Sequence, residues 1–184
     1  EPLPLADRAF DAIISTEVIE HLENPRSVFR EFGRLLRPGG VLVLTTPNQE
    51  SLRSLLSLLL RGHYVDFLDS SYPAHITALV RRDFVRLCSE NSFESPLFFY
   101  SDTGSLPGAP TFSWQQVSAG LLRGRRFSDT IAMTTRKAVT RNIQTMSGIL
   151  PRVMPLHRRQ KTVTRMLTAV AMLPMPFKRR ESVQ

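Results

Sequence analysis

Two apolar runs separated by an amphipathic segment constrain the fold of this chain more than any other feature of its sequence. Residues 10–15 (FDAIIS) and 41–46 (VLVLTT) are mainly apolar, which is typical of parallel strands covered on both faces. Between them, Asn24-Pro25 is a favourable helix start and Pro38-Gly39-Gly40 a helix stop. Apolar side chains recur at helical spacing in the intervening segment: Val28, Phe32, Leu35 and Leu36. The sequence therefore predicts a strand–helix–strand unit with parallel strands and a right-handed crossover.

The same alternation continues along the chain. We expect further helices at 52–60, 80–90 and 114–122, further strands at 97–100 and 130–135, and loops at 63–77 and 104–110. Four strands alternating with helices indicate an α/β, doubly wound architecture with helices on both faces of the sheet. Sheets of this class bind ligands beyond the carboxyl ends of their strands. A candidate site is therefore expected near residues 15–17 and near Pro47-Asn48.

Positive charge is concentrated at the end of the chain. The 184 residues include 24 Lys and Arg against 16 Asp and Glu, and residues 139–184 hold nine of the former and one of the latter. Residues 1–138 are therefore balanced, at 15 each, and we divide the chain into a main domain (1–138) and a basic tail (139–184). The single cysteine, Cys88, favours a reducing, cytoplasmic compartment. Neither a signal-peptide pattern nor a run of 18 apolar residues occurs in the sequence.

A family resemblance follows from several short motifs in a fixed order. They are Leu3-Pro4-Leu5-Ala6-Asp7, Phe10-Asp11, Glu17-Val18-Ile19-Glu20-His21-Leu22, Asn24-Pro25, Arg34-Leu35-Leu36-Arg37-Pro38-Gly39-Gly40 and Thr46-Pro47-Asn48. Together they resemble the second half of a class I S-adenosylmethionine-dependent methyltransferase, of the ubiquinone-biosynthesis type. The resemblance covers residues 1 to about 138.

The resemblance implies a Rossmann-like, seven-stranded fold of which this chain holds strands four to seven, the last one antiparallel. The family's glycine-rich loop (G-x-G-x-G) is absent from this sequence. Because the chain also begins at Glu1 and not at a methionine, we expect it to be a fragment. Of the cofactor site, the resemblance places the main chain of Leu3 beside the adenine of S-adenosylmethionine. It places Thr16, followed by Glu17, beside the methionine part.

An acid–histidine cluster is the strongest candidate for chemistry. Glu17, Glu20 and His21 share one face of a helical turn, and the histidine of Pro73-Ala74-His75 resembles the residue that completes the metal site of small-RNA 2′-O-methyltransferases. These four residues could hold Mg²⁺ or Mn²⁺, which would lower the pKa of an acceptor hydroxyl. Alternatively, His21 or His75 acts without metal as a general base, with Glu20 in support. A purely structural role is the third interpretation.

The expected function is methyl transfer to a small-molecule acceptor, with oxygen as the expected acceptor atom. The alternative is a non-catalytic half-domain, either a degenerate binding module or a fragment. The leucine-rich segment 52–60 reads as a core helix that also covers the pocket, or else as a surface for a lipophilic substrate.

The tail carries an amphipathic pattern, with apolar residues at Val163, Met166, Leu167, Val170 and Leu173 among basic ones. It could contact an anionic membrane surface, dock on the main domain or stay disordered. Nucleic acid is an unfavoured partner because Phe177 is the only aromatic residue of the tail.

Overall fold

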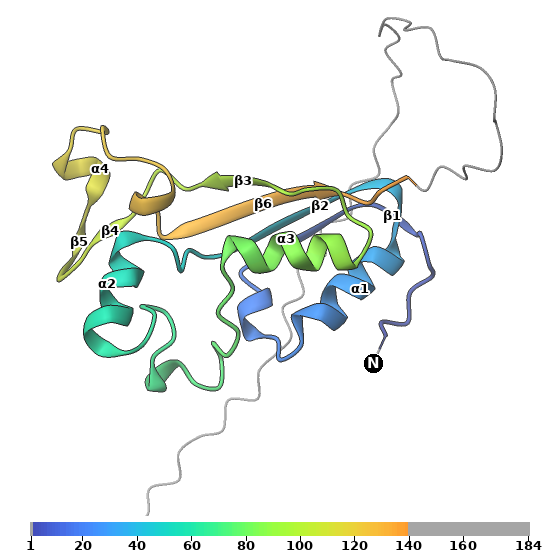
Figure 1. The fold of residues 1–184 in the computed structure, drawn as a ribbon, viewed down its shortest axis with the longest axis horizontal. Helices are drawn as coiled ribbons and strands as arrows, with labels where there is room; N and C mark the ends of the chain where they lie inside the picture. The colour runs from blue at the N-terminus through green and yellow to red at the C-terminus, as the bar shows by residue number, and fades with distance from the viewer. Residues whose placement is uncertain (1, 140–184) are drawn as a thin grey trace, which may run out of the picture.

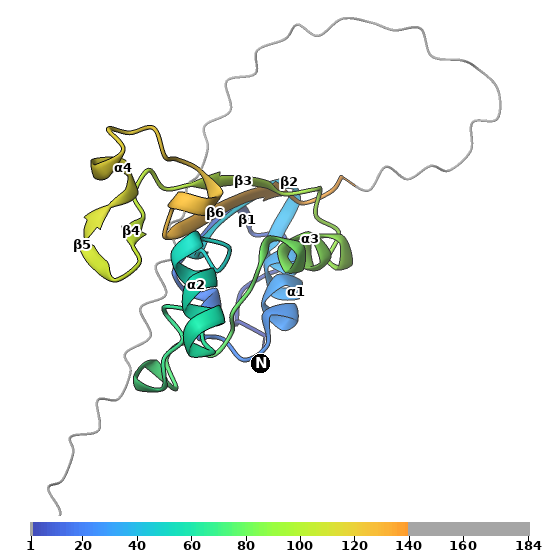
Figure 2. The same ribbon diagram turned by 60° about the vertical axis from the view of Figure 1, so that its left-hand side comes forward.

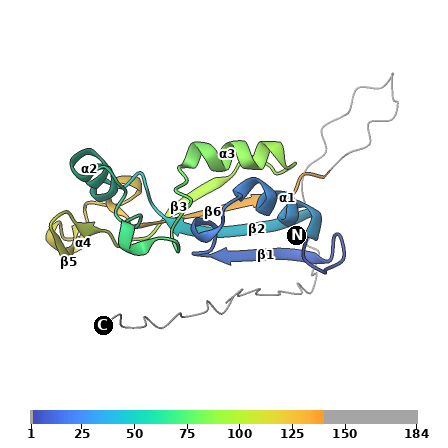
Figure 3. The same ribbon diagram turned by 90° about the horizontal axis from the view of Figure 1, so that it is seen from below.

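A mixed four-stranded sheet forms the centre of the molecule in the computed structural model, which describes residues 2–139 (Figure 1). Its strands are β1 (Phe10–Thr16), β2 (Leu36–Pro47), β3 (Leu97–Tyr100) and β6 (Thr130–Arg136). They lie side by side in the order β1-β2-β6-β3, as Figure 3 shows from below. β1 and β2 are parallel, whereas β6 is antiparallel to both of its neighbours. The α/β class and the antiparallel last strand are therefore confirmed.

The first crossover helix, α1 (Pro25–Leu35), begins as the sequence predicts and ends earlier. The side chain of Asn24 caps it by accepting a hydrogen bond from the Ser27 amide (3.1 Å). Pro38-Gly39-Gly40, expected as a helix stop, instead lies inside β2, where the pairing with β1 shifts register. A Cβ atom at Gly40 would stand 2.9 Å from the carbonyl oxygen of Arg37 and 3.1 Å from that of Asp11. Glycine is required there because two backbones approach closely at the irregular start of the strand.

Among residues 2–139, the helices that pack on the sheet cover one face and not both, which corrects the sequence-based expectation. α1 and α3 (Arg81–Glu90) lie on the same side in both Figure 1 and Figure 2. The reason is topological: β1 to β2 and β2 to β3 are parallel connections that step along the sheet in the same direction. Two right-handed crossovers in one direction place their helices on one face.

Alternation along the strands places the hydrophobic core on the helix-covered face. Leu42, Leu44 and Met133 are buried there and pack with the helix residues Phe29 and Phe84. The opposite row of β2, which includes Val41 and Val43, is half-buried, and Phe99 of β3 is 54% exposed. Within residues 2–139, the second face of the sheet has no helix packed on it.

A small unit connects β3 to β6 at the carboxyl end of β2. It consists of a hairpin, β4 (Ser105–Leu106) and β5 (Ala109–Ser113), a one-turn helix α4 (Trp114–Val117) and the 3-10 turn η3 (Arg125–Phe127). The expected loop at 104–110 is thus partly a hairpin, and the expected helix at 114–122 is shorter. Figures 1 and 2 show this unit at the same end of the sheet as α2 (Leu52–Arg61).

In the described range, no helix has both the length and the apolar character needed to span a bilayer. The amphipathic segment expected within the basic tail lies outside the described residues.

Candidate active site

The acid–histidine cluster forms where β1 ends. Thr16 is the exposed last residue of the strand, and the 3-10 turn η1 (Ile19–His21) follows it. Between them, Glu17 adopts a φ of 50°, in the left-handed region, which costs a residue with a side chain about 1 kcal/mol. The Glu17 amide donates to both the carbonyl (3.0 Å) and the hydroxyl (3.2 Å) of Thr45 on β2. The turn is therefore fixed to the sheet in a strained conformation, a feature found often at functional sites.

Glu20 is the innermost residue of the cluster. It is 1% exposed, and its carboxylate accepts a hydrogen bond from the hydroxyl of Thr46 (3.1 Å). Among residues 2–139, no Lys or Arg side chain reaches within 4.0 Å of this carboxylate; the nearest ring nitrogen is His21 Nε2 at 3.9 Å. A buried carboxylate is costly without a positive partner. Glu20 is therefore a buried carboxyl group held by Thr46 and bordered by His21.

His21 and His75 present the same ring nitrogen to the site. His21 Nδ1 lies 2.6 Å from the carbonyl oxygen of Ala74, and His75 Nδ1 lies 2.6 Å from that of Asp66. A carbonyl oxygen can only accept, so each Nδ1 carries the hydrogen and each Nε2 of the neutral ring keeps a free lone pair. The two rings are 4.7 Å apart between centroids. Two lone pairs are thus oriented as a metal ligand or a proton acceptor requires.

The structure brings three of the four expected metal-binding residues together. One ligand atom each of Glu20, His21 and His75 lies within 4.8 Å of the others. Glu17 is outside this group of three, although its carboxyl is near enough to Glu20 for their charges to interact. Burial raises the pKa of the Glu17 carboxyl, against a hydrogen bond from Thr45, and the carboxylates of Glu20 and Asp66 raise it further.

Leu3 does not join the cluster. Its amide donates to a carboxylate oxygen of Glu31 (2.9 Å), and its carbonyl accepts from Arg34 (3.1 Å), both on the second half of α1. Arg34 also binds the Leu5 carbonyl (2.7 Å) and the Asp7 carboxylate (2.6 Å). The segment that precedes β1 is therefore held against α1, whereas Thr16 lies at the far end of the strand.

The loop at 62–77 folds back onto η1 and delivers His75. The amides of Ile76 and Thr77 both donate to the carbonyl of Glu20 at 3.0 Å. Asp66, within this loop, was missed by the sequence reasoning because a loop residue follows no periodic pattern. Burial raises the pKa of its carboxyl, while the charges of Arg53 and His75 lower it.

The helix α2 buries two of its serines and none of its leucines: Leu52, Leu55 and Leu56 are half-buried, and Leu58, Leu59 and Leu60 are exposed. Ser54 and Ser57 are 3% and 8% exposed, whereas Leu59 and Leu60 are 79% and 77% exposed. The expectation of a leucine-packed core helix is therefore wrong.

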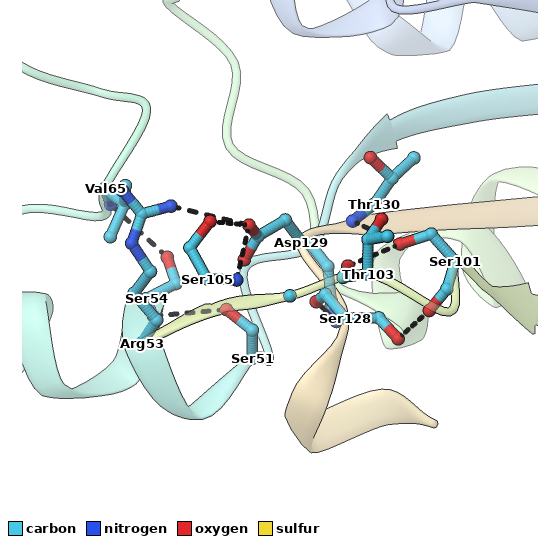
Figure 4. Close-up of polar contacts among 12 residues, drawn as sticks. Ser51, Arg53, Ser54, Val65, Ser101, Thr103, Ser105, Ser128, Asp129 and Thr130 are labelled. Atoms are coloured by element: carbon cyan, nitrogen blue, oxygen red, sulfur yellow. Dashed lines mark hydrogen bonds and ion pairs between the residues drawn. The ribbon is translucent and has the colours of Figure 1, made fainter. Parts of the chain in front are cut away.

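The serine side of α2 holds the loop that carries His75. The Ser54 hydroxyl donates to Gln49 Oε1 (3.1 Å) and accepts from the Val65 amide (3.4 Å), as Figure 4 shows in part. Arg53, also drawn there, pairs with Asp129 (3.6 Å).

The hairpin is attached to the same region. The carboxylate of Asp129, the residue before β6, accepts from both the amide and the hydroxyl of Ser105 at 2.8 Å (Figure 4). Asp129 therefore joins β4 to α2 through Arg53.

Comparisons with known proteins point to one family. Residues 3–95 match the family model described as a methyltransferase domain. The chain is 37% identical over 84 residues to the ubiquinone biosynthesis O-methyltransferase of Xanthomonas oryzae pv. oryzae (strain PXO99A), covering 40% of this chain and 34% of that protein. It is 45% identical over 47 residues to a probable S-adenosylmethionine-dependent methyltransferase of Mycolicibacterium smegmatis, covering 26% and 18%. The chain thus spans about a third of the length of the first of these relatives.

A solved structure shares the fold. It is a SAM-dependent methyltransferase from Thermotoga maritima, described as a possible histamine N-methyltransferase, with a TM-score of 0.51 at 18% identity. The superposition covers 73% of this chain and 59% of the other.

Proposed function

The chain belongs to the methyltransferase domain family, and on that premise we propose that the protein transfers a methyl group from S-adenosylmethionine to an oxygen atom of a small-molecule acceptor. The observation that carries the proposal is the pair of free Nε2 lone pairs of His21 and His75 beside the buried carboxylate of Glu20. Oxygen is favoured as the methyl acceptor because relatives that match over 84 residues are named O-methyltransferases.

The reaction needs a site that removes a proton from the acceptor hydroxyl. As the oxygen attacks the methyl carbon, the S–CH₃ bond breaks, the O–CH₃ bond forms, and S-adenosylhomocysteine leaves. The hydroxyl proton goes to Nε2 of His21 or His75, and the carbonyl of Ala74 or Asp66 holds that ring in place through Nδ1. Thr16 and Glu17, at the exposed end of β1, are proposed to line the methionine side of the cofactor. The main chain of Leu3, which lies against α1, is proposed to contact the adenine.

A divalent cation fits the same residues. Glu20 supplies one oxygen ligand and the two histidines supply Nε2 ligands, a donor set that suits Mn²⁺ and, with added water, Mg²⁺. When bound, such a cation lowers the pKa of an acceptor hydroxyl. The support is the near-complete burial of Glu20 next to the Nε2 atoms of His21 and His75. Glu17 is proposed to lie near the cation without coordinating it, so that its carboxyl interacts with the cation only through its charge.

The test uses the full-length protein, because the chain spans a third of its relatives. We expect S-adenosylhomocysteine release in the presence of a suitable acceptor. The double variant His21→Gln/His75→Gln should lose at least about a hundredfold in rate, the scale of removing a general base. Glu94→Gln, an exposed carboxylate beside β3, is the matched control and should keep full activity. Absence of S-adenosylmethionine binding in a folded protein would favour the non-catalytic alternative.

Metal use is decided by a separate measurement. After treatment with a chelator, addition of Mn²⁺ at about a hundred times its dissociation constant should stabilise the protein by about 2.7 kcal/mol. Glu20→Gln should remove this stabilisation, and Glu94→Gln should not. If activity is unchanged by chelation, the histidines act as bases without metal.

The basic tail is proposed to bind anionic membrane surfaces, which would place a cytoplasmic protein at the membrane periphery. The support is its net charge of +8 over residues 139–184. Co-sedimentation with vesicles that contain phosphatidylserine, compared with neutral vesicles, tests it.

A further inference from the structure

A hollow of about 440 Å³ opens beside His21. It is lined by His21, Glu23, Tyr72, Pro73, Ile76 and Thr77. Its volume lies within the range of small-molecule sites. The hollow therefore borders the acid–histidine cluster directly through the ring of His21.

Main-chain contacts fix one wall of the hollow. Ile76 and Thr77 are tied to the carbonyl of Glu20, and the Thr77 hydroxyl donates to the carbonyl of Leu22 (2.5 Å). His21 is held through Nδ1 by Ala74. The shape of this wall is thus set by the same hydrogen bonds that build the cluster, so a ligand would meet a preformed surface.

Apart from the Tyr72 hydroxyl, which can both donate and accept, the polar side-chain groups left free in this hollow are acceptors. The Thr77 hydroxyl hydrogen and His21 Nδ1 are already used, which leaves His21 Nε2 and the Glu23 carboxylate. In the part of the chain that the structure describes, Glu23 has no Lys or Arg within 4.0 Å, and no Lys or Arg lines the hollow. Such a surface attracts hydrogen-bond donors and positive charge and repels anions.

The apolar part of the lining offers a contact surface for a ligand with a flat ring. Tyr72 is 73% exposed, an unusual position for a large aromatic side chain, and it stands with Pro73 and Ile76 on the same hollow. An aromatic ring beside a free carboxylate is a favourable contact for a flat ligand with a donor or cationic substituent.

We infer that this hollow receives the methyl acceptor, and that Glu23 and Tyr72 select a small ring-bearing compound without negative charge, with a cationic substituent preferred. The ligand's role as methyl acceptor rests on the proposed methyl transfer, whereas the existence of the binding site does not depend on it. Glu23 and Tyr72 determine specificity, and His21 is the group that both the hollow and the cluster share.

Three phenols that differ in charge test the inference. Tyramine (cationic), p-cresol (neutral) and 4-hydroxybenzoate (anionic) are titrated against the full-length protein by calorimetry, without S-adenosylmethionine and in the presence of a chelator. We expect tyramine to bind at least about tenfold more tightly than 4-hydroxybenzoate, with p-cresol between them. This gap corresponds to attraction of one probe and repulsion of the other by an exposed carboxylate.

Two exposed residues provide the variants. Glu23→Gln should reduce the tyramine-to-benzoate ratio about fivefold, the upper size of one exposed charge contact. Tyr72→Ala should weaken all three probes alike. Glu94→Gln is the control and should change neither, and thermal melts should show that all variants are folded.

Three results would overturn the inference: equal binding of the cation and the anion, an unchanged ratio in Glu23→Gln, or no binding of any probe to the folded protein. These outcomes are independent of catalysis. If the probes bind in the expected order and no methyl transfer occurs with any acceptor, the proposed function fails and the site remains.

Discussion

In helix α2 we expect substitution of a buried serine to cost more stability than substitution of an exposed leucine. Ser54 is buried and makes two side-chain hydrogen bonds, to Gln49 and to Val65. Leu59 is 79% exposed. We therefore expect Ser54→Ala to destabilise the protein more than Leu59→Gln, although leucines dominate the helix.

The magnitude follows from what each change leaves behind. Ser54→Ala removes the donor to Gln49 Oε1, on a residue that is 2% exposed, and the acceptor of the Val65 amide. Unsatisfied buried groups cost about 1–3 kcal/mol, so we expect a loss of about 2 kcal/mol. Leu59→Gln, at a position mostly in water, should change the stability by less than about 0.5 kcal/mol.

Ser57→Ala is a control on the same buried side of the helix. Within residues 2–139, the Ser57 hydroxyl is buried and has no hydrogen-bond partner. Replacing it with a methyl group removes a desolvated polar group and improves helix propensity, so stability should rise by up to about 1 kcal/mol. The two serine variants should therefore differ in sign.

Urea unfolding of the full-length protein, followed by circular dichroism, measures all three variants. A neutral Ser54→Ala would refute the hydrogen-bond argument. A loss of about 2 kcal/mol in Leu59→Gln would show that residues outside 2–139 cover the leucine side of α2. Ser54→Ala should also lower activity, because Val65 belongs to the loop that carries His75.

Three further predictions concern other parts of the molecule. Burial raises the pKa of Asp66 above its ordinary value of 3.8, so the stability held by its protonated form is complete below that value and is lost as the pH rises through the raised pKa. The free energy of unfolding of Asp66→Asn, measured in urea, should therefore rise relative to that of the wild type between about pH 4 and pH 7. The same difference in unfolding free energy at pH 4 and at pH 7 would contradict this. Arg34→Met should release the segment at residues 3–7 from α1. Thermolysin, which does not require arginine at its cleavage site, should then cleave this segment faster, whereas Arg30→Met, at an exposed position of α1, should have no effect. Residues 1–184 expressed alone should elute as oligomers in size-exclusion chromatography, because within 2–139 β1 pairs with a strand on one side only and the second sheet face is uncovered; a monodisperse monomer with a sharp melt would show that the edge is protected.

The sequence by itself determined the local elements and the position of the candidate site. The apolar runs specified β1 and β2, Asn24-Pro25 specified the start of α1, and the spacing of Glu20 and His21 placed both in one turn after β1. These features depend on residues close together in the chain, because capping and side-chain periodicity are local properties of the backbone.

Only the tertiary structure decided which surfaces and residues meet. The leucines of α2 satisfy a helical period, yet the serine side is inward because Gln49 and Val65 need hydrogen-bond partners there. His75 meets His21, as the resemblance implied, because a loop without periodicity folds back onto the carbonyl of Glu20. Glu17 stays outside the group of three, in the left-handed turn that its amide fixes to Thr45. Periodicity specifies that a helix has two sides, but which side is buried depends on the elements that pack against it, and those are distant in sequence.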